Sequence, residues 1–154
     1  MKRFFVLLLA VGATFAIVPV ANAESIAHLT NIRTGRNIGY DRVVLDLTGP
    51  QPGQSSFVTT EPDYCASGKP ASVPGTEFLE VHVQPAATYD DAGNPTYTGP
   101  RNFATPGLTN VRGVAITCDF EADLGVVVGY ARPGSSHTVF FVQNPLRLVI
   151  DIKN

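Results

Sequence analysis

Two stretches of the chain, Arg42–Leu47 (RVVLDL) and Arg147–Ile152 (RLVIDI), repeat one pattern of polar and aliphatic positions. Aliphatic and β-branched residues dominate both, and the polar residues recur at even spacing, which is typical of β-strands. Successive side chains of an extended strand point to opposite faces. The pattern predicts two strands whose buried faces carry Val43, Leu45 and Leu47 in the first and Leu148, Ile150 and Ile152 in the second.

Similar runs occupy much of the remaining chain. Glu77–Gln84 alternates between apolar and polar residues, as expected for a strand with one face in water. Alternation along Val111–Phe120 predicts another strand, with Cys118 on its core side. Leu124–Ala131 and Thr138–Gln143 are almost continuously apolar, which favours central strands, and Ile26–Arg33 and Ser56–Thr60 complete the set. Many short strands with regular turn signals predict a β-sandwich, with a barrel as the second choice.

Two long segments rich in proline and glycine interrupt the strands. Glu61–Gly75 is predicted to be a loop. Pro85–Gly107 is longer still, and a segment of that length without regular structure is often a binding loop or a flap. It is therefore the first place where the sequence indicates function.

The first 23 residues have the pattern of a secretory signal peptide. Lys2 and Arg3 precede the apolar run Phe4–Val18, and Ala21-Asn22-Ala23 supplies a cleavage signature. The alternative is a retained membrane anchor, but the apolar run is short for a span. We expect cleavage to leave a secreted single domain, residues 24–154, with no stable membrane insertion. Removal of Lys2 and Arg3 leaves an acidic chain without a basic cluster, which argues against nucleic acid as a partner.

The only two cysteines, Cys65 and Cys118, are predicted to form a disulfide. A secreted protein folds in an oxidising compartment, where paired cysteines are normally oxidised. The alternative, a nucleophilic or metal-binding cysteine, would need a partner that the nearby sequence does not supply. Closing so long a loop stabilises the fold by about 4 kcal/mol in the chain-entropy model.

Signatures of catalysis and metal binding are missing from the sequence. No serine lies in a GxSxG turn, and the three histidines, His28, His82 and His137, are widely separated. Each histidine is interpreted as a surface residue of a strand rather than a ligand. We therefore expect no enzyme activity, no metal and no cofactor.

Polar and aromatic residues gather in two loop regions that could bind a ligand. Tyrosine rings stack on the apolar face of a sugar, and arginine binds a carboxylate through two hydrogen bonds. The alternative is that these residues only fix the loops to the sandwich. The candidates are Arg33, Arg36, Tyr40 and Asp41 around the first turn, and Tyr89, Tyr97 and Arg101 in the long segment.

Several stretches resemble the AMIN-like domains of secreted bacterial proteins. They are Ile32–Leu47 (IRTGRNIGYDRVVLDL), Gly93–Arg101 (GNPTYTGPR), Cys118–Tyr130 (CDFEADLGVVVGY) and Asn144–Ile152 (NPLRLVIDI), the last shared with the broader AMIN family. The resemblance implies a sandwich of two similar, mainly antiparallel sheets. It also implies a non-catalytic module of the cell envelope, associated with peptidoglycan.

The twin strands admit two arrangements. They could pair antiparallel, with Arg42 opposite Asp151 and Asp46 opposite Arg147, so that opposite charges face each other across the strands. Alternatively, they could occupy equivalent places in two different sheets, as the symmetry of the AMIN fold implies. We favour the second arrangement. In both, the four charged residues are structural.

The function expected from the sequence is non-catalytic binding in the cell envelope. The predicted ligand is peptidoglycan or another wall polymer, because a wall glycan offers both sugar faces and carboxylates. The alternative is an accessory module that binds an envelope protein through an exposed sheet edge.

Overall fold

The computed structural model describes residues 25–154. The predicted signal peptide, residues 1–23, therefore lies outside the described residues.

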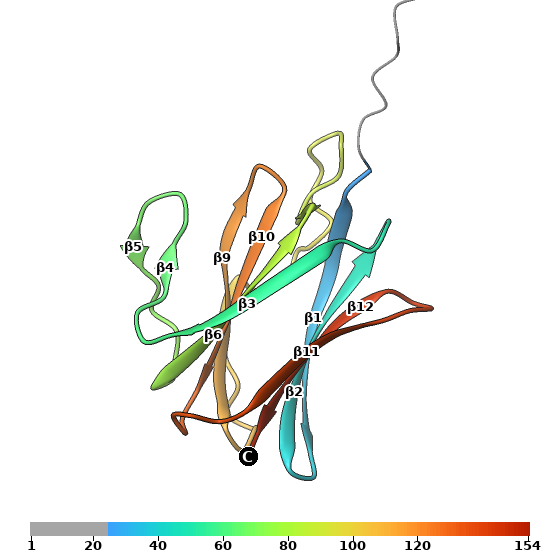
Figure 1. Cartoon of the computed structure of the whole chain (residues 1–154). Coiled ribbons are helices and arrows are strands. Elements are labelled where there is room, and N and C mark those ends of the chain that lie inside the picture. The colour runs from blue at the N-terminus through green and yellow to red at the C-terminus, as the bar shows by residue number, and fades with distance from the viewer. Residues whose placement is uncertain (1–24) are drawn as a thin grey trace, which may run out of the picture.

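Two five-stranded sheets and one small pair of strands make up the described chain (Figure 1). Sheet A has the order β11 (His137–Val142), β12 (Arg147–Lys153), β2 (Tyr40–Thr48), β1 (Ala27–Asn37) and β7 (Ala86–Ala87). Sheet B has the order β3 (Gly53–Thr59), β6 (Glu77–Gln84), β10 (Asp123–Tyr130), β9 (Val111–Phe120) and β8 (Asn102–Ala104). The short strands β4 (Asp63–Tyr64) and β5 (Lys69–Pro70) pair with each other.

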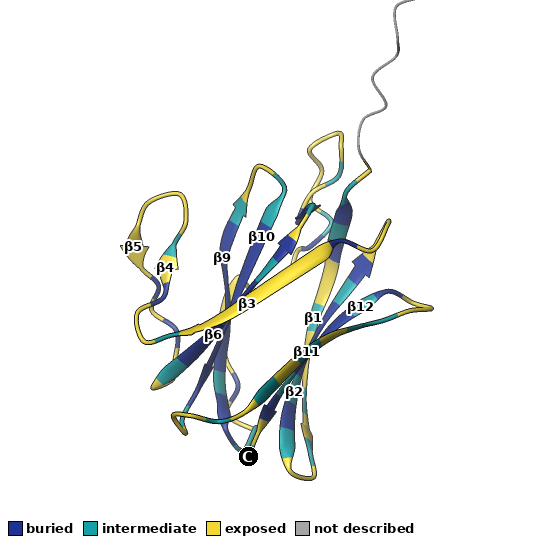
Figure 2. Cartoon of the chain, viewed as in Figure 1, coloured by how far each residue is buried: buried dark blue, intermediate teal, exposed yellow. Residues whose placement is uncertain are grey.

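The core lies between the inner faces of sheets A and B (Figure 2). All pairings are antiparallel except that of β1 with β7. This arrangement confirms the predicted all-β sandwich. The predicted buried faces of the twin strands are also confirmed, because the side chains of Val43, Leu45, Leu47, Leu148, Ile150 and Ile152 are all buried in that core.

The twin strands are neighbours in one sheet, so the arrangement favoured from sequence is wrong. β12 pairs antiparallel with β2, and Arg42 lies opposite Asp151 while Arg147 lies opposite Asp46. Arg precedes Asp in both strands, so the antiparallel alignment sets each Arg opposite an Asp. The same register sets Leu45 against Leu148 in the core.

Strand β11 lies at the edge of sheet A, whereas the sequence predicted a central strand. Only one of its faces is covered: Val139 and Phe141 pack on the core, and Phe140 is 39% exposed on the other face. A continuous apolar run had suggested burial on both faces. By contrast β10, the other strand predicted to be central, does lie in the middle of sheet B.

The predicted disulfide is present, but Cys118 faces away from the core. Its Cα atom lies 5.2 Å from that of Cys65. A β-bulge at Thr117 shifts the register of β9 against β10, so Ile116 faces Val126 in the core while Cys118 faces Gly125 on the outer side. One extra residue reverses the faces of everything after it, and alternation alone cannot reveal it.

The disulfide fastens a covering segment, residues 60–75, over the outer face of sheet B. This segment contains β4 and β5, which the sequence had predicted to be loop. Beneath it a second, smaller apolar cluster forms from Ala71, Val73, Phe78, Ala115 and Val127. No comparable cluster covers the outer face of sheet A in the described chain. One broad face of the sandwich is therefore covered and the other is open.

Candidate functional site

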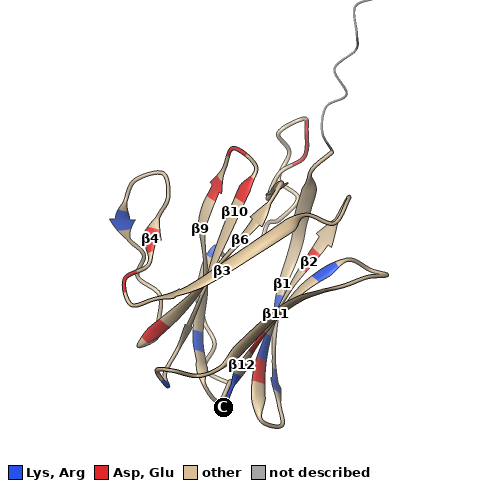
Figure 3. Cartoon of the chain, viewed as in Figure 1, with Lys and Arg blue, Asp and Glu red and all other residues tan. Residues whose placement is uncertain are grey.

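The open outer face of sheet A carries arginine and aspartate positions on three adjacent strands (Figure 3), and these residues form ion pairs. The guanidinium of Arg42 donates to the carboxylate of Asp151 at 2.7 and 2.8 Å. Arg33 on β1 donates to Asp46 on β2 at 2.7 and 2.6 Å. Both ion pairs are bidentate, with two hydrogen bonds each, which fixes the plane of each guanidinium group. The hairpin of β1 and β2 brings Arg33 to Asp46, and the antiparallel pairing of β2 with β12 brings Arg42 to Asp151.

Two aromatic rings flank the Arg42–Asp151 pair. The Arg42 guanidinium carbon lies 5.2 Å from the centre of the Tyr40 ring and 5.8 Å from that of Phe140. The Lys153 ammonium lies 5.8 Å from the same Tyr40 ring. These distances are those of cation–π contacts. The result is a surface on which aromatic faces and fixed charges alternate.

The charges of this face persist at neutral pH. The hydrogen bond from Arg33 lowers the pKa of Asp46, and its charge and that of Arg147 lower it further. The hydrogen bond to Asp151 raises the pKa of Arg42. The face holds Arg33, Arg42, Arg147 and Lys153 against only Asp46 and Asp151, so it carries an excess of positive charge in an acidic chain. We call this surface, with Tyr40 and Phe140, the sheet A face.

Two of the predicted ligand residues, Asp41 and Tyr97, are buried. Asp41 is fully buried, and its Oδ2 atom accepts the backbone N–H groups of Asn110 at 2.5 Å and Val111 at 3.0 Å. Tyr97 is 6% exposed, its hydroxyl donates to the carbonyl of Pro100, and burial raises its pKa. Its ring packs in the core and is not free to stack on a sugar.

The other candidates in the long segment lie apart from the sheet A face. Arg101 donates to the Asp119 carboxylate at 2.9 Å and to the Thr88 hydroxyl at 3.1 Å, which ties the segment to β9. Tyr89 is 37% exposed and forms an isolated bridge with Pro95. Of the seven candidates, the structure thus places Arg33 and Tyr40 on one surface and Arg36 next to Asp41 at one end of the sandwich.

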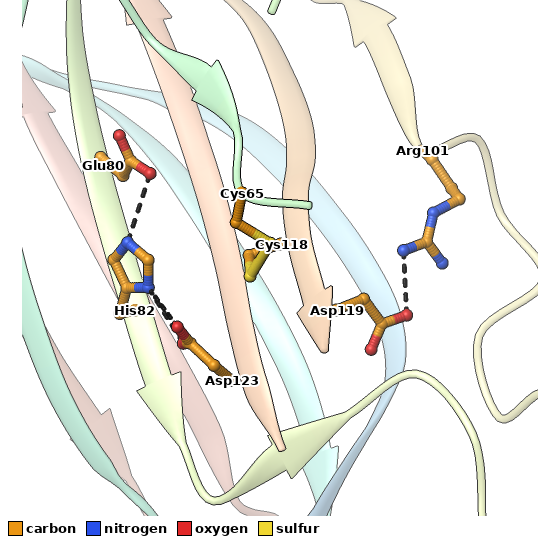
Figure 4. The surroundings of a disulfide bond; sticks show 7 residues. All are labelled: Cys65, Glu80, His82, Arg101, Cys118, Asp119 and Asp123. Atoms are coloured by element: carbon orange, nitrogen blue, oxygen red, sulfur yellow. Dashed lines mark hydrogen bonds and ion pairs between the residues drawn. A yellow bond between two sulfur atoms is a disulfide. The ribbon is translucent and has the colours of Figure 1, made fainter. Parts of the chain in front are cut away.

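Sequence reasoning missed two groups of residues. Phe140 was not among the candidates, because the apolar run Thr138–Gln143 predicted a central strand. On sheet B, His82 lies between two carboxylates, with Nδ1 2.9 Å from Asp123 and Nε2 3.2 Å from Glu80 (Figure 4). Glu80 and His82 alternate onto one face and could have been linked from sequence, but Asp123 comes from the neighbouring strand.

Neither a metal site nor a membrane-spanning helix is found in the described residues. No group of three or more His, Cys, Asp or Glu side chains in residues 25–154 is placed to hold a metal ion. No helix in this range is long and apolar enough to cross a bilayer.

Comparison with known proteins places this sandwich in a family. The family model of the AMIN-like domain matches residues 27–154, essentially all of the described chain. The chain belongs to the AMIN-like domain family. No curated protein and no solved structure gave a match to it. Family membership indicates a module associated with the cell envelope, and AMIN-like domains are generally non-catalytic binding modules.

Proposed function

We propose that this AMIN-like domain is a secreted, non-catalytic binding module that recognises peptidoglycan or another wall polymer through the sheet A face. One observation supports this more than any other: Tyr40 and Phe140 flank a fixed Arg42–Asp151 pair on the sandwich face that no other segment of residues 25–154 covers.

The chemistry of the sheet A face suits an anionic glycan. Aromatic rings offer flat apolar contacts to sugar rings, and the paired carboxylates and guanidinium groups offer hydrogen bonds to hydroxyl and amide groups. Val44 and Val149 lie between the charged and aromatic side chains and are only 8% and 4% exposed, so the base of the face is apolar. The positive excess attracts a polymer that carries carboxylates, and salt should weaken the binding.

Co-sedimentation with purified cell-wall sacculi tests this proposal. We expect the mature protein to pellet with the sacculi, and to pellet less as salt is raised. The double variant Tyr40→Ala/Phe140→Ala should lose most of the bound fraction because the aromatic contacts are gone.

Phe57 provides the matched control. It is 50% exposed on β3, an edge strand as β11 is, but it lies in sheet B and stacks on His82. Phe57→Ala should pellet like the wild type. The proposal fails if the wild type stays in the supernatant, or if the Phe57 variant loses as much binding as the double variant.

A second function, binding of an envelope protein, is favoured by the edge strand β3. Six of its seven residues are exposed, among them Phe57 and Val58 at 50% and 45% (Figure 2). Exposed apolar edges of this kind pair with strands of other chains. A cross-link from β3 to an envelope protein, with sacculus binding absent, would favour this function.

A further inference from the structure

A groove at one end of the sandwich separates the tip of the β1–β2 hairpin from the loop that leads into β9. Two adjoining hollows, of about 660 and 360 Å³, meet at Arg36. One reaches the hairpin tip, where Ile38 is fully exposed, and the other reaches the partly buried Phe103 and Leu108. The groove thus has an arginine at its middle and apolar side chains towards both ends. Both the hairpin tip and the end of β12 lie at this end of the molecule (Figure 1).

Arg36 has no carboxylate partner in the described chain. Arg33, Arg42 and Arg101 each form an ion pair, whereas Arg36 forms none within 4.0 Å. Its cross-strand neighbour is Asp41, but the Asp41 carboxylate is turned to the backbone N–H groups of the opposite wall. The Arg36 guanidinium therefore forms no ion pair in the groove, although Asn154, which follows β12, also lines the hollow at the hairpin tip.

Both walls of the groove are held in place before any ligand binds. Asp41 stands on β2 in one wall and accepts hydrogen bonds from Asn110 and Val111 in the other, which fixes the spacing between them. Arg112 donates to the carbonyls of Leu108 and Thr109 at 3.2 and 3.1 Å and so holds the loop. A groove with fixed walls loses little entropy on binding.

The β1 side of the groove presents an open strand edge. β7 pairs with β1 only at Ala27 and His28, and no strand of the described chain pairs with β1 on that side beyond them. An extended chain can therefore approach β1 closely enough to add to it as a strand.

We propose that this groove binds the C-terminal tail of a partner protein, added as a strand along β1 with its terminal carboxylate on Arg36. The open edge supplies hydrogen bonds for an extended L-peptide, the unpaired guanidinium supplies the complementary charge, and Ile38, Phe103 and Leu108 supply apolar contacts. This site is separate from the sheet A face, and it stands whether or not the chain binds a wall polymer.

Titration with a defined peptide, followed by NMR of the labelled mature protein, tests the proposal. The probe is an N-acetylated pentapeptide of alternating valine and threonine with a free carboxylate, compared with its C-terminal amide. The free acid should shift the amide signals of residues 34–38 and 103–109. Arg36→Gln should weaken its binding about tenfold, as loss of a charged hydrogen-bonded pair does, while Arg36→Lys should retain part of it.

Arg132 provides the control, because it is exposed, has no carboxylate partner within 4.0 Å, and does not line the groove. Arg132→Gln should bind the peptide like the wild type.

The proposal is overturned if the amide binds as tightly as the acid, if Arg36→Gln has no effect, or if acetate competes as well as the peptide. It is also overturned if N-acetyl-D-alanyl-D-alanine binds more tightly than the L-peptide, because the groove would then take a wall peptide. The Tyr40→Ala/Phe140→Ala variant should keep peptide binding, so failure of the two proposals can be told apart.

Discussion

A few buried polar residues hold the two sheets together at one end of the sandwich. Asp41 accepts two backbone hydrogen bonds from the start of β9, and Asn110 extends the connection. The Asn110 side chain donates to the carbonyl of Lys153 at 2.6 Å and accepts from the backbone N–H of Arg132 at 3.0 Å. Side chains from few positions thus join β2, β9 and β12 and the turn after β10.

Asp41→Ala should destabilise the domain by about 3 kcal/mol, because it leaves two buried N–H groups without their acceptor. Urea denaturation followed by circular dichroism measures the effect. Asp91→Ala, at an exposed loop position, is the control and should change the free energy of unfolding by less than about 0.5 kcal/mol. Equal stability of the two variants would contradict the structural role of Asp41.

The Arg33–Asp46 pair predicts a specific pH dependence. Its hydrogen bond lowers the pKa of Asp46 in the folded protein below the ordinary value of 3.8. The stability that the pair contributes is therefore fully present above that value, and it is lost as the pH falls through the lower folded-state pKa. The contribution is below about 1 kcal/mol because the Arg33 side chain is half exposed.

Arg33→Gln should lower the free energy of unfolding at pH 7, and the difference from the wild type should shrink as the pH falls below about 4. Urea titrations at several pH values measure this. Arg36→Gln removes an arginine without a carboxylate partner, so its effect should be independent of pH in the same range. A deficit of Arg33→Gln that stays constant down to pH 2 would refute the pairing.

At the scale of elements, the covering segment makes the two faces of the sandwich different. It crosses sheet B closely: a Cβ added at Gly129 would lie 2.2 Å from the Pro74 carbonyl oxygen, and one at Gly113 would lie 2.6 Å from the Pro74 ring. The glycines of β9 and β10 thus make room for the segment that Cys65 and Cys118 hold down. With that face occupied, the sheet A face is the broad face that no other described segment covers.

Removal of the disulfide should release the covering segment and leave sheet A intact. Cys65→Ala/Cys118→Ala should lower the free energy of unfolding by about 4 kcal/mol in the chain-entropy model, since the bond closes a separation of 53 residues. Urea denaturation gives the loss, and NMR shows where the change lies. Signals of residues 60–75 should move while those of β2 and β12 stay in place; the reverse pattern would contradict this division.

Local patterns in the sequence predict where the strands lie. Which residues of different strands become neighbours depends on how the strands pair, and that pairing is not a local property. Glu77–Gln84 and Val111–Phe120 were predicted with the bounds that β6 and β9 have, because alternation is a local signal. The neighbour of a strand is not local: Arg42 meets Asp151 across 109 positions, and no pattern within either strand chooses its sheet.

The candidate site could likewise be predicted only in part, because its residues come from several strands. Arg33 and Tyr40 were identified from their residue types beside a turn, yet their place on an open face follows from the pairing of β1, β2 and β12. Phe140 was missed because an apolar run does not tell which face is in water. The bulge at Thr117 was missed because one inserted residue leaves composition and length unchanged.

Across the whole molecule, charge is distributed unevenly between the two sheets. The sheet A face has its positive excess, whereas Glu80, Asp119, Glu121 and Asp123 lie on or beside sheet B (Figure 3). The protein as a whole is acidic, so the proposed function predicts that an anionic polymer approaches the sheet A face rather than the sheet B side. This asymmetry should orient the domain on a wall surface with the covering segment pointing away.

A residue-by-residue map of binding by NMR, with soluble fragments of cell-wall glycan added to the labelled mature protein, tests the proposed sheet A face most directly. We expect the largest shifts on Tyr40, Arg42, Phe140, Val149 and Asp151. The signals of residues 60–75 should not move. Shifts concentrated on sheet B or on the covering segment, or no shifts at millimolar fragment, would contradict the assignment of the sheet A face as the binding surface.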